Sequence, residues 1–125
     1  MSLTAIRSDQ LAPPVGPFSQ AVSTGDLIFL SGQVGLDADG RLVAGGVDAE
    51  ARQIFANLGA VLDAAGKSFG DVVRVGVFLA DMADFAALNA IYAQHFDQPY
   101  PARTTVAVAA LPLGAAVEID MVVKA

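Results

Sequence analysis

The chain has 125 residues, of which 54% are hydrophobic and 16% are charged, and its net charge is −6. This length suits one domain over residues 1–125, and the negative charge with scattered Lys and Arg argues against a nucleic-acid partner. No apolar run approaches the roughly 20 residues of a membrane-spanning helix, and the N-terminus has no secretory pattern. We therefore expect a cytoplasmic protein that has no membrane partner.

The chain contains no cysteine and a single histidine, His95. Disulfides, thiolate metal sites and a multi-histidine metal site within one chain are therefore excluded. His95 stands in no nucleophile pattern, so a Ser-His-Asp hydrolase is not expected, and its place near the end of a predicted helix suits the helix dipole. The high hydrophobic share indicates that some apolar surface meets other protein, which predicts a homo-oligomer.

The N-terminal part of the chain predicts an edge strand, a loop and a hairpin. The prolines of residues 8–17 cannot donate ladder hydrogen bonds, so we expect a loop there, after a short strand at residues 4–7. Thr24-Gly25-Asp26 predicts a hairpin turn between strands at residues 18–22 and 27–30. The second strand is apolar on both faces, so we expect helices over one face and a neighbouring subunit over the other.

The middle of the chain predicts two helices on either side of a strand. Asp48 is expected to cap the first helix and Gly66 to end it. An apolar run at residues 72–79 predicts a long strand, and Asp81 is expected to cap the second helix. The stripe of the second helix indicates core packing and consists of Phe85, Leu88, Tyr92 and Phe96. This order of elements predicts an α+β fold, with a mixed sheet and two helices packed on one face.

The two C-terminal strands carry the side chains best suited to chemistry. In residues 117–123, alternation places the apolar residues on one face and Glu118 on the other. In residues 101–108, the same reasoning places Arg103 and Thr105 away from the apolar face. Arg103 and Glu118 are then expected on the same side of the sheet, away from the helices. There the guanidinium could bind a carboxylate ligand while the glutamate holds a water or moves a proton; a surface salt bridge is the other interpretation.

Several motifs together resemble the RidA/YjgF family, the reactive intermediate deaminases. They are Gly16-Pro17-Phe18-Ser19-Gln20-Ala21, Ser31-Gly32-Gln33, Asn89 with Tyr92, Pro101-Ala102-Arg103-Thr104-Thr105-Val106, and Leu111-Pro112 before Val117-Glu118-Ile119. The resemblance covers about residues 6–123 in the right order and spacing. It implies a chorismate-mutase-like α+β fold and a homotrimer with a central barrel-like core and clefts between subunits. It also implies that small 2-imino acids or their enamine tautomers are hydrolysed to 2-keto acids and ammonia, without cofactor or metal.

The resemblance also implies roles for single residues. Arg103 matches the arginine that clamps the substrate carboxylate, and the Thr105 backbone N–H would assist it. Glu118 matches the glutamate thought to position the hydrolytic water. A glutamate close to an arginine is expected to stay ionised, because an opposite charge favours the charged form.

Four further residues complete the site that the resemblance implies. Ser31 and Gly32 match the strand end that lines the cleft, although a β-bulge explains the glycine equally well. Asn89 matches a frequent family residue. Phe18 departs from the pattern, because many members carry a tyrosine whose hydroxyl reaches the cleft. Because Phe18 lacks this hydroxyl, an alternative function stays open: a non-catalytic module that binds small carboxylates in the same intersubunit cleft.

Overall fold

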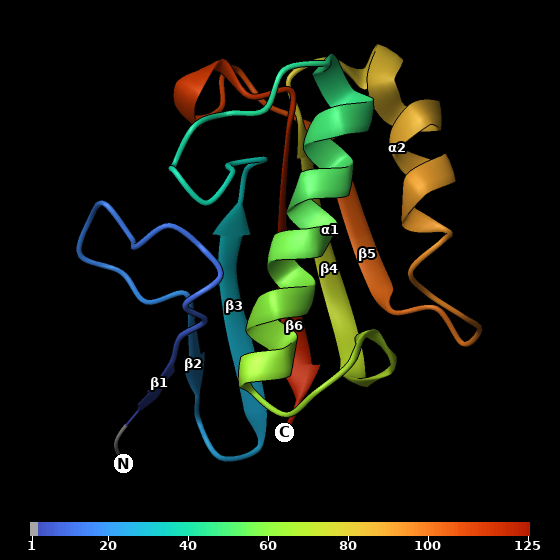
Figure 1. Cartoon of the computed structure of the whole chain (residues 1–125). Helices are drawn as coiled ribbons and strands as arrows, with labels where there is room; N and C mark the ends of the chain where they lie inside the picture. Colours follow the sequence, from blue (N-terminus) through green and yellow to red (C-terminus); the bar gives the residue numbers. More distant parts are fainter. Residues whose placement is uncertain (1–2) are drawn as a thin grey trace.

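A six-stranded mixed sheet forms the frame of the molecule (Figure 1). The computed structural model describes residues 3–125. The strands lie side by side in the order β1-β2-β3-β6-β4-β5; β4 and β5 run parallel, and every other pair is antiparallel. Their bounds are Thr4–Ile6 for β1, Ala21–Ser23 for β2, Leu27–Gln33 for β3, Val72–Leu79 for β4, Ala102–Ala107 for β5 and Val117–Lys124 for β6. The predicted mixed sheet is confirmed.

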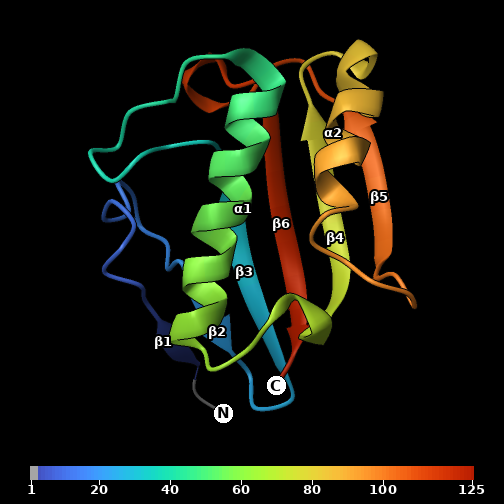
Figure 2. The same ribbon diagram turned by 45° about the vertical axis from the view of Figure 1, so that its right-hand side comes forward.

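Two helices, α1 (Gly46–Ala64) and α2 (Phe85–Tyr92), cover the same face of the sheet (Figures 1 and 2). Short 3-10 turns join the elements and span Phe69–Asp71, Met82–Asp84 and Pro112–Gly114. This arrangement confirms the predicted α+β class with both helices on one side. No helix in residues 3–125 has both the length and the apolar character needed to span a membrane.

The ends of the helices agree only in part with the prediction. Helix α1 begins at Gly46 rather than after Asp48, because Gly45 and Gly46 take φ angles of 119° and 72° and turn the chain into the helix three residues earlier. Asp48 lies in the first turn, where its charge suits the helix dipole. Gly66, at φ 71°, ends the helix as predicted. Asp81 does not cap α2 itself, whose N-cap is Asp84. Its carboxylate accepts a hydrogen bond of 2.9 Å from the Ala83 N–H and caps the 3-10 turn that leads into α2.

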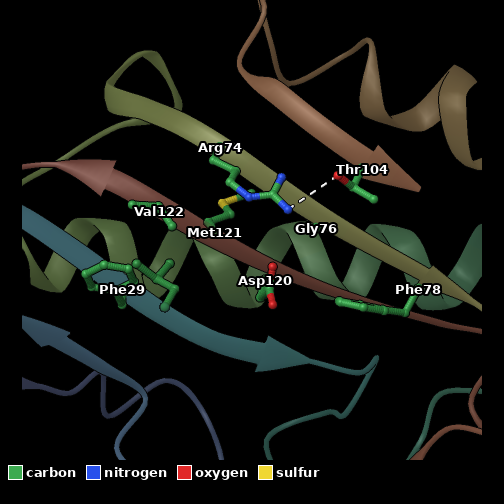
Figure 3. A pocket seen from close by; sticks show the side chains of 9 residues that line it. Phe29, Arg74, Gly76, Phe78, Thr104, Asp120, Met121 and Val122 are labelled. Carbon is green, nitrogen blue, oxygen red and sulfur yellow. Dashed lines mark hydrogen bonds between the residues drawn. The ribbon is translucent and has the colours of Figure 1, made fainter. Parts of the chain in front are cut away.

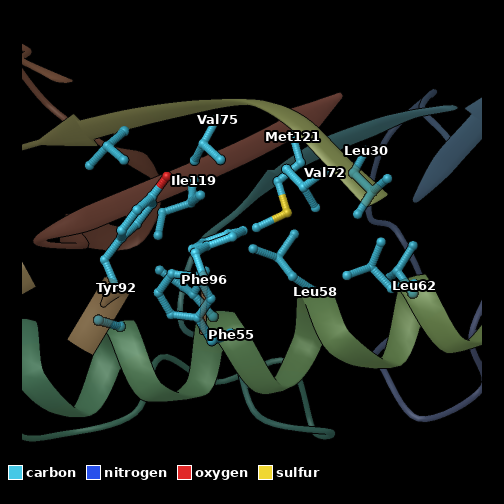
Figure 4. Packing of buried hydrophobic residues seen from close by; sticks show 14 of the residues in the cluster. Leu30, Phe55, Leu58, Leu62, Val72, Val75, Tyr92, Phe96, Ile119 and Met121 are labelled. Atoms are coloured by element: carbon cyan, nitrogen blue, oxygen red, sulfur yellow. The ribbon is translucent and has the colours of Figure 1, made fainter. Parts of the chain in front are cut away.

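The hydrophobic core lies between the helices and the sheet (Figure 4). The apolar stripe of α1 meets the buried face of β6, where Ile119 and Met121 are at most 2% exposed. His95 stacks on the ring of Phe55, with centroids 4.3 Å apart and planes 12° apart, so its aromatic contact replaces the simple dipole role that we expected. Burial, followed by the charge of Arg52, lowers the pKa of His95.

The opposite face of the sheet has no covering element within the described chain, and we call it the open face. It carries Phe29 and Val106, which are 43% and 40% exposed. The predicted burial of strand 27–30 is therefore confirmed on the helix side, where Ile28 and Leu30 are each 4% exposed. Burial of its second face against a neighbouring subunit stays a prediction.

A single buried carboxylate joins the start of α1 to the start of β6. Glu50 is 4% exposed, and its Oε1 accepts a hydrogen bond of 2.7 Å from the Ala116 N–H. Gly35 lies close to the same end of α1. A Cβ added to Gly35 would lie only 2.9 Å from the Glu50 Cα. A hydrogen bond between residues 66 positions apart fixes β6 against α1 just before the strand reaches Glu118.

We expect Glu50→Ala to lower the free energy of unfolding by about 2 kcal/mol, because the Ala116 N–H loses its acceptor. Glu50→Gln keeps an acceptor oxygen and should lose less. Urea unfolding of both variants measures the difference, with Asp63→Ala on the exposed face of the same helix as a control that stays within about 0.5 kcal/mol. Equal stability of the wild type and Glu50→Ala would contradict the assignment.

Candidate functional site

The register of β4 against its two neighbours decides which face each site residue occupies. Val75 pairs with Met121 of β6 on one side and with Arg103 of β5 on the other, so these three side chains share the helix-covered face. Phe78 pairs in the same way with Glu118, which therefore lies on the open face. The prediction that Arg103 and Glu118 emerge on the same side of one sheet is wrong. Strand β5 is an edge strand of Ala, Thr, Val and Arg, and its weak alternation led to the wrong face.

Arg103, Asn89 and Thr105 form what we call the edge-strand group. Arg103 and Thr105 are half-buried on the helix side of β5, beneath α2, which carries Asn89. The Arg103 Cζ lies 4.6 Å from the centroid of the Tyr92 ring. Among residues 3–125 the one ion pair joins Arg7 and Asp9, so the Arg103 guanidinium has no carboxylate partner there. A half-buried guanidinium without an acid is available to a ligand anion.

Three buried polar atoms near this group have no hydrogen-bond partner within the described chain: Asn89 Oδ1, Tyr92 OH and Thr105 Oγ1. Buried polar atoms are normally satisfied, and an exception calls for a water, a ligand or a stated reason. Figure 4 shows the Tyr92 hydroxyl pointing at the sheet close to Ile119. Burial raises the pKa of Tyr92, while the nearby Arg103 charge acts in the opposite direction.

Phe18, Ser31, Gly32 and Glu118 form a second set, the bulge group. The pairing of β3 with β6 shifts between Leu30 and Gln33, which confirms the β-bulge at Ser31-Gly32. An added Cβ on Gly32 would lie 2.6 Å from the Glu118 Oε2, so the carboxylate occupies the space that any side chain at this position would need. A side chain at position 32 would therefore displace the Glu118 carboxylate from its present place.

Ser31 links this bulge to the loop that carries Phe18. Its hydroxyl donates a hydrogen bond of 2.6 Å to the Ser19 carbonyl, and its N–H donates one of 2.9 Å to the Gln20 carbonyl. Phe18 is 53% exposed and lies in the loop before β2, not in a strand as predicted. The Gln20 side chain holds the other end of that loop, because its Oε1 accepts a hydrogen bond of 2.7 Å from the Ser8 N–H.

The protonation of Glu118 is influenced by its surroundings on the open face of the sheet. Burial, with a smaller contribution from the negative charge of Asp120, raises the pKa of Glu118 above its ordinary value of 4.5. Our expectation that Arg103 keeps Glu118 ionised is wrong within one chain, because the two lie on opposite faces. A raised pKa moves the carboxyl toward neutral pH, where it exchanges protons more readily.

Asp120, two residues along β6 from Glu118 on the same face, lines a hollow of about 250 Å³ on the open face (Figure 3). Burial raises the pKa of Asp120 above its ordinary value of 3.8, against the opposing effects of a hydrogen bond from the Gly76 backbone and of the Arg74 charge. Arg74 itself donates a hydrogen bond of 3.3 Å to the Thr104 hydroxyl. The open face therefore combines apolar residues with two carboxyls that are partly removed from water.

The sequence patterns missed two neighbours of the predicted site residues. Tyr92 and Phe85 were interpreted as core alone, yet both rings lie against Arg103. Their spacing with Asn89 was the available signal, since residues 85, 89 and 92 share one face of a helix. In residues 3–125, no three His, Asp or Glu side chains gather in a way that could hold a metal ion.

The ordinary pKa values are 3.8 for Asp120 and 4.5 for Glu118, and both are raised in the folded chain. We expect the free energy of unfolding to fall as pH rises from these ordinary values through the raised ones. In that interval the folded chain binds more protons than the unfolded chain, so stability is lost as protons leave. Urea unfolding between acidic and neutral pH tests this. The double variant Glu118→Gln/Asp120→Asn should show a smaller fall, and an unchanged slope would contradict the assignment.

The chain is similar to proteins of known family over almost its whole length. Residues 9–125 match the protein family described as endoribonuclease L-PSP. The chain is 45% identical over 125 residues to the 2-iminobutanoate/2-iminopropanoate deaminase of Dermatophagoides farinae, with 98% of each chain covered. It matches the crystal structure of RidA from the Antarctic bacterium Psychrobacter sp. with a TM-score of 0.92 and 42% identity, over 98% of this chain and 99% of the other.

A further solved structure, E. coli TdcF with bound serine, matches with a TM-score of 0.90 and 35% identity, over 98% of each chain. The sequence motifs, the sheet with its two helices and these similarities agree with one another. The chain belongs to the RidA/YjgF family, the family also described as endoribonuclease L-PSP.

Proposed function

We propose that this protein hydrolyses small reactive 2-imino acids, of the 2-iminobutanoate and 2-iminopropanoate type, to 2-keto acids and ammonia. The observation that carries the proposal is the half-buried Arg103 guanidinium, which has no carboxylate partner in residues 3–125. Every 2-imino acid presents a carboxylate, which a guanidinium binds through two parallel hydrogen bonds. The similarity to a deaminase of that name and to TdcF, whose bound serine also has an α-carboxylate, supports the same ligand class.

A site that uses both Arg103 and Glu118 takes them from two copies of the chain, because one chain carries them on opposite faces of its sheet. Arg103 lies on the edge strand β5, where a neighbouring copy has access. The open face presents Phe29, Phe78 and Val106 to such a copy. This arrangement supports the chorismate-mutase-like homotrimer that the family resemblance implies, with clefts between subunits.

In this cleft the chemistry needs only an anchor and a proton carrier. Arg103 holds the substrate carboxylate, which fixes the imine carbon in place and removes part of the entropic barrier. The Glu118 carboxylate takes a proton from water as its oxygen bonds to that carbon and the C=N electron pair moves to nitrogen. The Glu118 carboxyl then gives this proton to the nitrogen. As the C–N bond breaks, the proton of the new hydroxyl passes through Glu118 to the same nitrogen, so ammonia leaves and the keto group forms. The raised pKa of Glu118 suits both transfers.

The remaining residues of the predicted site have supporting roles in this proposal. Gly32 leaves room for the Glu118 carboxylate, and Ser31 holds the loop that presents Phe18. Asn89 and Thr105 lie beside Arg103 with unpaired buried oxygen atoms, which a water or an amino group of the ligand would satisfy. The alternative, a module that binds carboxylates without turnover, uses the same anchor and differs only in whether Glu118 moves a proton.

We expect Arg103→Ala to lower kcat/KM by roughly 10²–10⁴-fold, or about 3–5 kcal/mol of transition-state stabilisation. An amino-acid oxidase that releases 2-imino acids, coupled to trapping by semicarbazide, gives the rate. Arg41→Ala on the exposed surface is the matched control and should keep the wild-type rate. A fully active Arg103→Ala variant would rule out Arg103 as the anchor, and an inactive wild type that still binds 2-keto acids would favour the binding module.

We expect two inactive variants, Arg103→Ala and Glu118→Gln, to regain activity when their subunits are mixed. In a mixed oligomer, a cleft that receives Arg103 from one chain and Glu118 from the other is complete. A cyclic trimer that contains both variants has one complete cleft in three, which sets the expected activity of the purified mixed sample at about a third of the wild type. Co-expression with two different affinity tags, followed by purification over both, provides the mixed sample for the same assay. Activity no higher than that of the separate variants would show that the two residues do not meet across subunits.

A further inference from the structure

The cation of Arg103 lies against aromatic rings instead of an acid. Its Cζ atom is 4.6 Å from the centroid of the Tyr92 ring and 5.7 Å from that of the Phe85 ring. Both distances are within the range of cation–π attraction. The described residues supply no ion pair to this guanidinium. Aromatic faces therefore supply the electrostatic stabilisation that a carboxylate usually gives to a partly buried arginine.

The two rings come from one face of α2, since residues 85 and 92 are two turns apart. Tyr92 is 7% exposed, and its ring packs 4.5 Å from that of Phe96 and 6.1 Å from that of Phe55. Phe85 is 36% exposed and forms the outer side of the pair. The Tyr92 ring is thus held in place by the core, while the Phe85 ring is partly exposed on the side open to solvent.

A guanidinium that lies flat on the face of an aromatic ring is attracted by the ring and keeps its in-plane N–H groups free for other acceptors. A carboxylate in the same place would occupy those N–H groups and compete with the carboxylate of a substrate. The rings of Tyr92 and Phe85 therefore orient the cation and leave its hydrogen-bonding edge open. A lysine at position 103 would not be held in this way, because it lacks the planar group.

We propose that Tyr92 and Phe85 are positioning residues, whose ring faces hold the Arg103 guanidinium so that its N–H edge points at the carboxylate of a small 2-oxo or 2-imino acid. The choice of ligand rests on the proposed function. We assign the role to the Tyr92 ring and not to its hydroxyl, which is buried and has no hydrogen-bond partner among residues 3–125. Tyr92→Phe should therefore preserve the role, and Tyr92→Leu should remove it while leaving a side chain of similar apolar character.

The first measurement is the affinity for 2-oxobutanoate, determined by titration calorimetry on the assembled protein. We expect Tyr92→Leu to weaken binding about tenfold and Tyr92→Phe to stay within about twofold of the wild type. Phe85→Leu should weaken binding less, because that ring is farther from Arg103. In the imine assay, Tyr92→Leu should raise KM with a smaller change in kcat.

The second measurement follows the Arg103 Nε–H resonance by NMR, assigned by comparison with Arg103→Lys. A proton near an aromatic face carries a ring-current shift, so Tyr92→Leu should move this resonance and Tyr92→Phe should leave it nearly in place. Phe96→Leu is the matched control, because it removes a buried ring that touches Tyr92 without lying over Arg103. It should lower the melting temperature as Tyr92→Leu does, and yet keep the affinity and the resonance.

Wild-type affinity together with an unmoved resonance in Tyr92→Leu would overturn the proposal, as would a wild type that binds no 2-oxobutanoate at millimolar concentration. A weakening of affinity by Phe96→Leu equal to that by Tyr92→Leu would also overturn it, because general destabilisation would then be the cause. If the wild type hydrolyses no imino acid but Tyr92→Leu still weakens 2-oxobutanoate binding, the positioning role stands and the proposed reaction fails.

Discussion

The pairing of β4 with both β5 and β6 is the constraint on which the arrangement of this molecule depends. Because paired residues point to the same face of a sheet, β4 determines which face each paired residue of β5 and β6 occupies. Val75 thereby directs Arg103 toward the helices, and Phe78 directs Glu118 toward the open face. A slip of one residue in either pairing would exchange the faces and bury the wrong side chains. The intersubunit character of the proposed site follows from this register.

The fold was largely predictable from the sequence, and the reasons are physical. Strand β6 alternates sharply, with Val, Ile and Met on one side and acids on the other, because one face is fully buried. Strand β4 was predicted with its observed bounds, since a mostly apolar run, interrupted only by Arg74 and Gly76, suits a central strand. The start of α1 was not predictable from capping rules, because a pair of glycines turns the chain there without any side-chain cap.

The members of the candidate site stay a prediction from the sequence motifs, and the geometry that relates them was not predictable. The motifs pointed to Arg103 and Glu118, but the face of β5 could not be read from Ala, Thr and Val on an edge strand. The apolar side of that strand is the open one, where Val106 lies, and its helix side accepts an arginine because α2 offers aromatic rings. Of the aromatic residues predicted as one helical stripe, Phe96 lies beyond the end of α2 and packs in the core, whereas Tyr92 contacts a cation, and a hydrophobic pattern alone does not distinguish these roles.

The contact between Gly32 and Glu118 has a consequence for protein engineering. An added carbon at Gly32 would meet the Glu118 side chain, so a library randomised at this position would return mostly variants with a displaced Glu118 carboxylate. The loop of residues 8–20 is different, because a few hydrogen bonds from Ser31 and Gln20 hold its backbone while the Phe18 ring stays exposed. New substrate ranges are therefore best sought by varying position 18 and its flanks, with the bulge kept as an unchanging support.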